Sequence, residues 1–342
     1  MCGKYAKIIL LFMFVPEYSI TQKILKNISI IEYSKAILDT TKILPSWEKQ
    51  LQREATARKT YSNLQMMGIN YSFETVKKVL DQMSQEKIKE ASNIEISLNL
   101  TEEIAKNKEL EEVDLKYLHK TLSNELLPKA KQGSYRSTKI PGKTSPEEIL
   151  AEMTELFDWY NSLDAKESHP VITAGIIKAK LEVIQPFESF NFTISNLASE
   201  IILKMSDYNL GGYTSLEDYY HKTKTQYEQL TSSIARNSAD FTWWIDYFTE
   251  GLALEASNIK EKVTLLAKDT KIAKTTGRIK LTSRQERIVE YLQDYGILQN
   301  KDFKKVFGDI SEDSILRDLK LLTKMGMVQK NGSTKSSKYE LK

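Results

Sequence analysis

The stretch that decides the fold runs QPFESFNFTISN from residue 185 to residue 196. It is predicted to be an irregular loop that leads from a helix over about residues 171–184 into a second helix. A helix start of this kind attracts anions, because its first N–H groups have no intrahelical acceptor. That geometry alone is a weak signal for any particular ligand. The second helix is indicated by apolar residues at steps of three and four, which share one face: Ile194, Leu197, Ala198, Ile201, Ile202 and Met205.

The segments before this loop also have helical periodicity. Residues 20–130 are predicted to form successive helices, with apolar residues such as Val76, Val79 and Leu80 three or four positions apart. Residues 131–147 are polar and rich in turn formers, which predicts a loop or a short hairpin. Helical periodicity resumes after Pro146, a position where proline is common. We therefore expect a mainly α-helical domain with a small hairpin.

The composition favours a mainly helical protein of two or three domains. The chain has 342 residues, of which 41% are apolar, enough to build ordinary hydrophobic cores. Only 7 prolines and 13 glycines occur, and long stretches are rich in Leu, Ile, Lys and Glu. Strands should therefore be few, and a disordered chain is excluded.

Charge is distributed unevenly along the chain. Residues 262–342 carry 18 Lys and Arg against 10 Asp and Glu, a balance of +8, whereas the rest carries 31 against 36, a balance of −5. A basic end on a weakly acidic body is typical of a segment that contacts nucleic acid, because phosphate neutralisation dominates such affinities. A lysine-rich solvated surface has the same balance, so charge alone leaves both interpretations open.

The single cysteine, Cys2, excludes intramolecular disulfides, thiolate zinc sites and Cys-X-X-Cys redox chemistry. A cytoplasmic location is therefore expected. Residues 8–15 (IILLFMFV) follow two lysines and could form the core of a signal peptide, although Pro16 ends the run. The run is too short to span a bilayer, and we expect no membrane contact. A misplaced start codon and a buried N-terminal segment are the alternatives.

The loop resembles the signature of the Fic family, His-Pro-Phe-x-(Asp/Glu)-Gly-Asn-Gly-Arg-x-x-Arg. The resemblance implies a Fic-like (fido) domain whose motif histidine takes a proton from a target hydroxyl, which then attacks the α-phosphate of ATP. This reaction, AMPylation of a protein, uses ATP and Mg²⁺. Further segments agree with the family in order and spacing: residues 115–119 (LKYLH), 133–136 (GSYR), 169–170 (HP), 219–220 (YY) and 240–248 (DFTWWIDYF).

The general base of the motif is missing from this chain. Gln185 stands at the position of the histidine, and glutamine has no titratable group that accepts a proton. The three histidines, His119, His169 and His221, lie elsewhere in the pattern. His169 is the nearest of them in sequence, but its family counterpart is a structural residue at a helix start. The resemblance therefore implies that Gln185 is inactive as a base.

The nucleotide cradle of the motif has changed as well. Ser189 takes the position of the metal-binding acid, although Glu188 beside it could reach the same place. Glycine permits positive φ and close approach of backbone N–H groups to phosphate. Phe190 and Phe192, at the two glycine positions, would each lose about 1–2 kcal/mol in that conformation and would crowd the cradle. The two phosphate-pairing arginines and the motif asparagine correspond to Thr193, Asn196 and Asn191.

Residues 61–66 (YSNLQM) resemble the inhibitory helix of many Fic proteins, Ser/Thr-x-x-x-Glu-Gly. In that helix the Glu pairs with the second motif arginine and blocks productive ATP binding, and the corresponding residue here is Gln65. The Glu and the Arg of this ion pair are both replaced here, by Gln65 and Asn196. The two losses agree with each other, because a buried carboxylate without its cation is costly. An ordinary core helix is the alternative interpretation of these residues.

Residues 281–342 resemble the winged-helix unit that often follows Fic domains. Apolar spacing predicts a first helix that opens at Leu281, a second over about residues 300–306, and a third that follows Ser311, a good N-cap. The apolar residues expected on the first helix are Ile288, Val289 and Leu292, and those on the buried face of the third are Ile315, Leu319 and Leu322. Gly326 starts a hairpin whose Asn-Gly turn opens a small basic wing. The third helix would enter the major groove and the wing would contact phosphates, although winged helices also serve protein contacts only. The residues expected to contact DNA are Ser314, Arg317, Lys320, Lys324, Lys335 and Lys338.

Four segments are therefore predicted: an N-terminal segment (1–49), the Fic-like domain (50–255), a helical linker (256–280) and the winged helix (281–342). We expect a catalytically impaired Fic-like protein that acts as a DNA-binding or regulatory scaffold. Duplex DNA is the expected partner, and a protein partner or a homodimer is a further possibility. One alternative is residual nucleotidyl transfer that uses Asn191, Glu188 and a relocated base. Another is a toxin–antitoxin-like or docking role.

Overall fold

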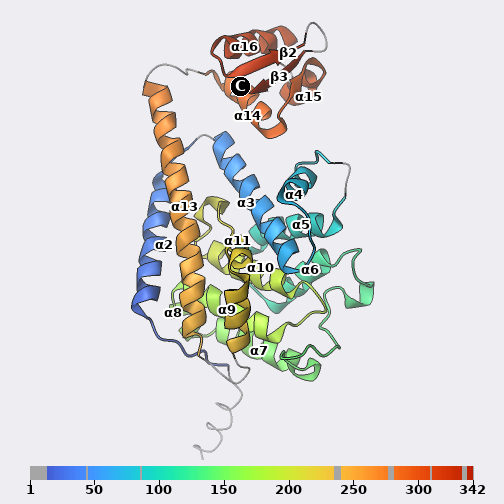
Figure 1. Ribbon diagram of the computed structural model, residues 1–342, viewed down its shortest axis with the longest axis vertical. Helices are drawn as coiled ribbons and strands as arrows, with labels where there is room; N and C mark the ends of the chain where they lie inside the picture. Colours follow the sequence, from blue (N-terminus) through green and yellow to red (C-terminus); the bar gives the residue numbers. More distant parts are fainter. Residues whose placement is uncertain are drawn as a thin grey trace, which may run out of the picture. The chain divides into compact units, whose positions relative to one another are not determined.

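The computed structural model describes residues 14–341 except 44, 85–86, 235–239, 276–280, 309 and 333–336. They form two compact units (Figure 1). The first comprises the residues up to Thr40 with Glu54–Glu261, and the second comprises Thr41–Arg53 with the residues from Lys262 onward. Lys335 and nearly all of the apolar run at residues 8–15 lie outside the described residues.

The prediction of a mainly α-helical protein is confirmed. In the described part of the chain, no helix combines the length and apolar character that a membrane crossing requires. The helices up to residue 275 are α2 (Gln22–Thr40), α3 (Pro45–Met66), α4 (Phe73–Leu80), α5 (Lys89–Lys106), α6 (Glu112–Leu122), α7 (Ile149–Tyr160), α8 (Leu163–Glu167), α9 (Pro170–Ile184), α10 (Asn191–Met205), α11 (Leu216–Lys222), α12 (Lys224–Ser233) and α13 (Thr242–Thr275), with the short 3₁₀ turns η1 (Lys129–Lys131), η2 (Pro146–Glu148) and η3 (Leu210–Gly212).

Helix α9 is the centre of the first unit. Every residue from Val171 to Ile184 is buried, and the helix packs against α10, α7 and α12. It begins at Pro170, whose fixed φ suits a first helical position, and the His169 side chain accepts a hydrogen bond from the Val171 N–H. Because α10 follows α9 after a short loop and packs along it, the loop is held by the most buried part of the molecule.

The small hairpin expected in residues 131–147 is absent, and this part of the prediction is wrong. The segment holds η1 and irregular backbone instead. The backbone N–H groups of its two halves donate to the end of α9 and to the loop that follows it. The Arg136 N–H donates to the Pro186 carbonyl at 2.9 Å, and the Thr144 N–H donates to the Val183 carbonyl at 3.5 Å.

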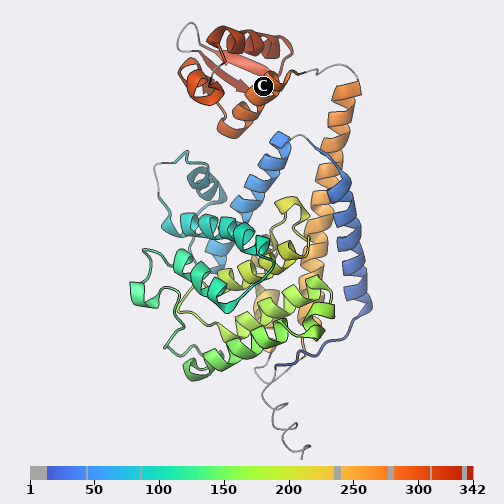
Figure 2. The same ribbon diagram turned by 180° about the vertical axis from the view of Figure 1, so that it is seen from behind.

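Two of the expected domain boundaries fall inside continuous helices. The boundary at residue 50 lies within α3, and the one at residue 255 lies within α13. Helix α13 continues past residue 255 because its buried stripe does, through Ala256, Ile259 and Val263. The expected N-terminal segment also contains α2, whose Ile24 and Ile31 belong to the main core. Figures 1 and 2 show α2 alongside α13, where the Asn27 amide donates to the Thr249 hydroxyl at 3.1 Å.

From residue 281 onward, the described part of the second unit folds into three α-helices and a small antiparallel sheet of strand order β1-β3-β2. Its own core includes Ile288, Leu292, Ile315, Leu319 and Leu322, the residues expected on the buried faces of the first and third helices. The elements are α14 (Ser283–Tyr295), β1 (Leu298–Gln299), η4 (Asn300–Asp302), α15 (Phe303–Phe307), α16 (Glu312–Lys324), β2 (Val328–Asn331) and β3 (Lys338–Leu341).

A buried carboxylate positions α16 against α14. Asp318 accepts hydrogen bonds from the side chains of Arg284 and Gln285, and the bond from the Gln285 amide measures 3.0 Å. Gln285 also takes part in the capping box that starts α14. Ser311 occupies the N-cap of α16 as expected, but its hydroxyl bonds to that of Ser314 at 2.9 Å. The face of α16 opposite Asp318 is thereby fixed toward solvent.

Candidate functional site

The loop between α9 and α10 contains two residues with a left-handed backbone. Gln185 follows α9 with φ 44° and ψ 68°, and Phe190 precedes α10 with φ 60° and ψ 15°. This conformation costs a residue with a Cβ about 1–2 kcal/mol. The Phe190 side chain is only 7% exposed, and burial of such a ring stabilises by about 1.5–3 kcal/mol, so packing offsets the strain. The loop keeps a glycine-like backbone at Phe190 without a glycine.

The Phe192 ring packs into the helical core. Its centroid lies 5.5 Å from that of Tyr227 and 6.3 Å from that of Tyr220, and the Lys178 ammonium lies 4.9 Å from it. We expected the rings of Phe190 and Phe192 to crowd the anion cradle, but both pack against core residues. The physical reason is that burying an apolar ring lowers the free energy of the folded chain more than leaving the ring beside a solvated helix start.

The Asn191 side chain closes the loop. Its Oδ1 accepts a hydrogen bond from the Phe187 N–H at 2.9 Å, and its Nδ2 donates to the Phe187 carbonyl at 2.8 Å. These two bonds engage the amide oxygen and one amide N–H. Asn191 therefore acts as a clamp that holds Phe187 at a fixed distance from the start of α10.

The Glu188 carboxylate is already engaged by its neighbours. The Lys131 ammonium lies 3.2 Å from one oxygen, and the Thr138 hydroxyl donates to the other at 2.9 Å. The Thr138 hydrogen bond and the charge of Lys131 lower the pKa of Glu188. A metal ion could use this carboxylate only if it displaced both groups. The adjacent Ser189 hydroxyl is buried and has no hydrogen-bond partner among the described residues.

The buried guanidinium of Arg136 joins the loop to residues 133–145. It donates to the Gln185 carbonyl at 2.7 Å and to the Ile184 carbonyl at 3.2 Å, and also to the carbonyls of Thr138 and Thr144. The last carbonyls of a helix have no intrahelical donor, and a cation beside them also interacts favourably with the helix dipole. Arg136 therefore fixes the end of α9 and with it the position of Gln185.

His119 packs against the same loop. Its ring stacks on that of Phe187 with centroids 4.2 Å apart, and its Nδ1 accepts a hydrogen bond from the Gly133 N–H at 2.9 Å. Burial lowers the pKa of His119 to about 4, against a smaller rise from the backbone of Ser189. The ring is neutral at pH 7 with its proton on Nε2, so neither nitrogen has a free lone pair for a substrate.

We expect acidification to destabilise the protein through His119. Its folded pKa of about 4 lies below the ordinary 6.5, so the unfolded chain binds more protons between these pH values. The free energy of unfolding should therefore fall by about 3 kcal/mol as the pH drops from 6.5 to 4. Urea unfolding at several pH values measures this slope. A His119→Gln variant keeps an acceptor for Gly133 and should lack the His119 contribution; identical slopes in both proteins would contradict this account.

Residues 109–203 match the Fic/DOC family model. The chain contains a Fic/DOC family domain. The matched residues include α6, α9, α10 and the loop, together with Arg136 and His119, which hold the loop in place.

Solved structures with Fic domains share the fold. A Fic family protein from Desulfovibrio desulfuricans G20 has a TM-score of 0.63 at 18% identity, over 96% of this chain and 98% of that one. A Fic domain containing signaling protein from Bacteroides thetaiotaomicron has 0.57 at 22% identity, over 72% and 98%. Fic-1 from C. elegans has 0.55 at 15% identity, over 73% and 74%. No curated protein matches the sequence.

The other two histidines make contacts elsewhere in the first unit. His169 caps the start of α9, and its Nε2 lies 3.1 Å from a Glu32 oxygen. Because α9 has 15 residues, its two ends are about 22 Å apart. His221 belongs to α11, where its ring lies 5.7 Å from that of Tyr61. Although His169 is the nearest histidine in sequence, the structure brings His119 to the loop.

The end of α3 meets the start of α10 in this domain. The Thr193 hydroxyl lies 3.8 Å from the Met67 sulfur, and the Gln65 amide donates to the Tyr71 carbonyl at 3.0 Å. The Asn196 Nδ2 is buried and has no hydrogen-bond partner among the described residues. The Gln65 amide N–H is thus directed to the connection between α3 and α4 and not to Asn196.

Sequence reasoning missed Arg136 and His119 as the residues that hold the loop. Both occur in segments that the family resemblance highlighted, but nothing local assigned them a partner. His119 follows Leu115 and Leu118 on the buried face of α6, a pattern that indicates a core position only. Over the described ranges, no three or more His, Cys, Asp or Glu side chains are grouped as a metal site requires.

Proposed function

We propose that this chain is a Fic-like pseudoenzyme, which has kept the fold of the Fic/DOC domain and lost nucleotide transfer. The Fic family generally transfers AMP or similar groups to proteins. Gln185 lacks the group that would take a proton from a target hydroxyl. The Nδ1 lone pair of His119 accepts the Gly133 N–H, and Glu188 is engaged by Lys131 and Thr138. These contacts argue against residual transfer by a relocated base.

We further propose that the second unit is a winged helix that binds duplex DNA. The observation that carries this proposal is its order of three helices followed by a β-hairpin, with Arg317, Lys320 and Lys324 exposed on the third helix. Their spacing of three and four residues places them on one face of α16, opposite the buried Ile315 and Leu319. A helix with this face can enter a major groove.

The acidic residues of α16 restrict where DNA would lie. Glu312 and Asp313 occupy the first turn, where they interact favourably with the helix dipole but would repel phosphate. The contact surface would therefore be the second and third turns of the helix. Lys338 is exposed on β3 and suits a phosphate contact, whereas the hydroxyl of Ser314 already bonds to Ser311.

Protein docking is the competing function for the same helix. Leu321 and Met325 are 41% and 45% exposed, and they lie one turn apart next to the basic residues. An apolar pair of this kind suits a protein partner better than a phosphate backbone. Salt dependence distinguishes the two, because counterion release dominates DNA affinity.

We expect the full chain to bind mixed-sequence duplex DNA with an affinity that falls steeply with salt. An Arg317→Ala/Lys320→Ala variant should bind more weakly, and its salt slope should decrease by about one for each phosphate that the protein no longer neutralises. Fluorescence anisotropy of labelled duplex at several salt concentrations measures both effects. Lys120→Ala, which removes an exposed charge from α6, is the matched control. Absence of binding at low salt would overturn the proposal and favour docking through Leu321.

A further inference from the structure

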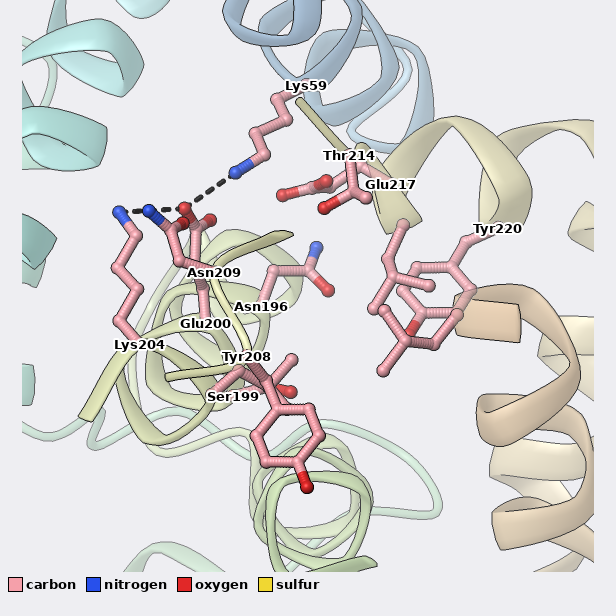
Figure 3. A pocket seen from close by; sticks show the side chains of 13 residues that line it. Lys59, Asn196, Ser199, Glu200, Lys204, Tyr208, Asn209, Thr214, Glu217 and Tyr220 are labelled. Carbon is pink, nitrogen blue, oxygen red and sulfur yellow. Dashed lines mark hydrogen bonds and ion pairs between the residues drawn. The ribbon is translucent and has the colours of Figure 1, made fainter. Parts of the chain in front are cut away.

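A polar pocket lies beside α10, away from the loop (Figure 3). Side chains of α3, α10, α11 and α13 line it, and it opens to solvent. No residue of the loop 185–190 or of the segment 133–145 lines it. Of the positions assigned to the nucleotide cradle at the start of α10, only Asn196 also lines this pocket.

Three buried polar groups line this pocket without a partner. Asn196, Ser199 and Tyr220 are 6%, 3% and 0% exposed, and the Asn196 Nδ2, Ser199 Oγ and Tyr220 hydroxyl have no hydrogen bond within the described part of the chain. Figure 3 shows the Asn196 amide directed into the cavity. Buried polar groups are nearly always satisfied, so three that line one cavity indicate a polar guest.

One wall of the pocket is an ion-pair network that is complete in itself. Glu200 lies 2.6 Å from the Lys59 ammonium and 3.0 Å from that of Lys204 (Figure 3). Lys204 also lies 2.7 Å from Glu102. The two lysines lower the pKa of Glu200 to about 2. Because carboxylates already neutralise both ammonium groups, this wall offers N–H donors rather than an unpaired positive charge.

Glu217 on the neighbouring helix α11 has no such partner. It is 3% exposed, and no described Lys, Arg or His lies within ion-pair distance of its carboxylate. The Ser215 hydroxyl donates to it weakly, at 3.4 Å. A buried carboxylate with so little compensation requires a donor from elsewhere. The pocket thus lacks an acceptor for Asn196 and a donor for Glu217.

We propose that this pocket binds a small polar molecule without net charge, which donates a hydrogen bond to Glu217 and presents an oxygen acceptor to Asn196. Lys59, Lys204, Glu200 and Glu102 form a network without net charge, and burial raises the pKa of Glu217, which disfavours its charged form. The lining therefore offers no unpaired cation to an anionic ligand and no well-solvated carboxylate to a cationic one. Two classes of compound share the required chemistry, zwitterionic amino acids with neutral side chains and neutral monosaccharides.

Calorimetry and thermal unfolding of the full chain with these two classes of compound test the proposal. We expect a member of one class to bind with a measurable dissociation constant and to raise the unfolding temperature progressively as its concentration increases. Binding by amino acids alone identifies a zwitterion site, and binding by sugars alone identifies a polyol site. Inorganic phosphate is the anionic comparison. No binding by either class, as expected for a pocket that holds only water, or binding by phosphate in their place would overturn the proposal.

Two substitutions test whether the ligand binds in this pocket. Glu217→Gln keeps the size of the side chain and removes its charge, and Asn196→Leu removes the amide donors at similar volume. Each should weaken binding by about tenfold or more, as for a lost hydrogen bond to a buried polar group. Glu228→Gln makes the same acid-to-amide change on the exposed face of α12 and should have no effect. Unchanged binding by a folded Glu217→Gln variant would show that the ligand lies elsewhere.

Discussion

The Gln185→His variant is expected to transfer AMP no faster than the unchanged chain. The substitution restores a general base, a group whose absence typically costs about 10²–10⁴ in rate. The phosphates of ATP would still meet Thr193 and Asn196 in place of arginines, and Glu188 would still be paired with Lys131. When several catalytic groups act as a unit, restoring one of them recovers little of the reaction rate. Labelling with radioactive ATP measures the rate. Efficient transfer by this single variant would contradict the pseudoenzyme proposal.

Nucleotide binding is expected to return before transfer in a stepwise repair. The structure favours starting with Thr193→Arg and Asn196→Arg, because Phe190 already has the left-handed backbone of a glycine. Replacing Phe190 by glycine as well would empty a core position and cost about 3–5 kcal/mol, and replacing the partly buried Phe192 would cost less. Transfer should then require both Gln185→His and Ser189→Asp. Calorimetry with ATP and Mg²⁺ follows binding at each step, and labelling follows transfer.

The Arg136→Met variant is expected to lose about 3–5 kcal/mol in its free energy of unfolding. Methionine fills much of the same space but leaves four backbone carbonyls without their charged donor, and each such bond contributes about 1.5–3 kcal/mol before relaxation. Gln185 and the end of α9 should lose their fixed position at the same time. Urea unfolding followed by far-UV circular dichroism measures the change.

Lys131→Met is the matched control for this effect. Lys131 lies in the same segment, but its side chain is half exposed and makes one ion pair, to Glu188. An exposed pair contributes about 0–1 kcal/mol, so the free energy of unfolding of this variant should be close to that of the unchanged chain. If Arg136→Met were no less stable than Lys131→Met, the guanidinium would not organise the loop as we describe.

The sequence predicted the helices around the loop well, because the spacing of apolar residues is local information. Residues such as Ile194 and Leu197 occur at helical steps, and their burial on one face of α10 follows from that period alone. The same reasoning placed Ile315, Leu319 and Leu322 in the core of the second unit. For residues 131–147 it left a loop and a short hairpin open, and the structure has the loop. Turn formers indicate a reversal of the chain but not what the reversed chain bonds to.

The sequence by itself therefore determined the helical class, the loop between α9 and α10 and the absence of a histidine at Gln185. Only the tertiary structure decided that Arg136 and His119 hold that loop and that the rings of Phe190 and Phe192 pack into the core. It also decided that Lys59, Asn196 and Glu217 meet in one pocket. These contacts join residues far apart in the chain. Their partners are set by which helix faces pack together, and no local pattern of residue types contains that information.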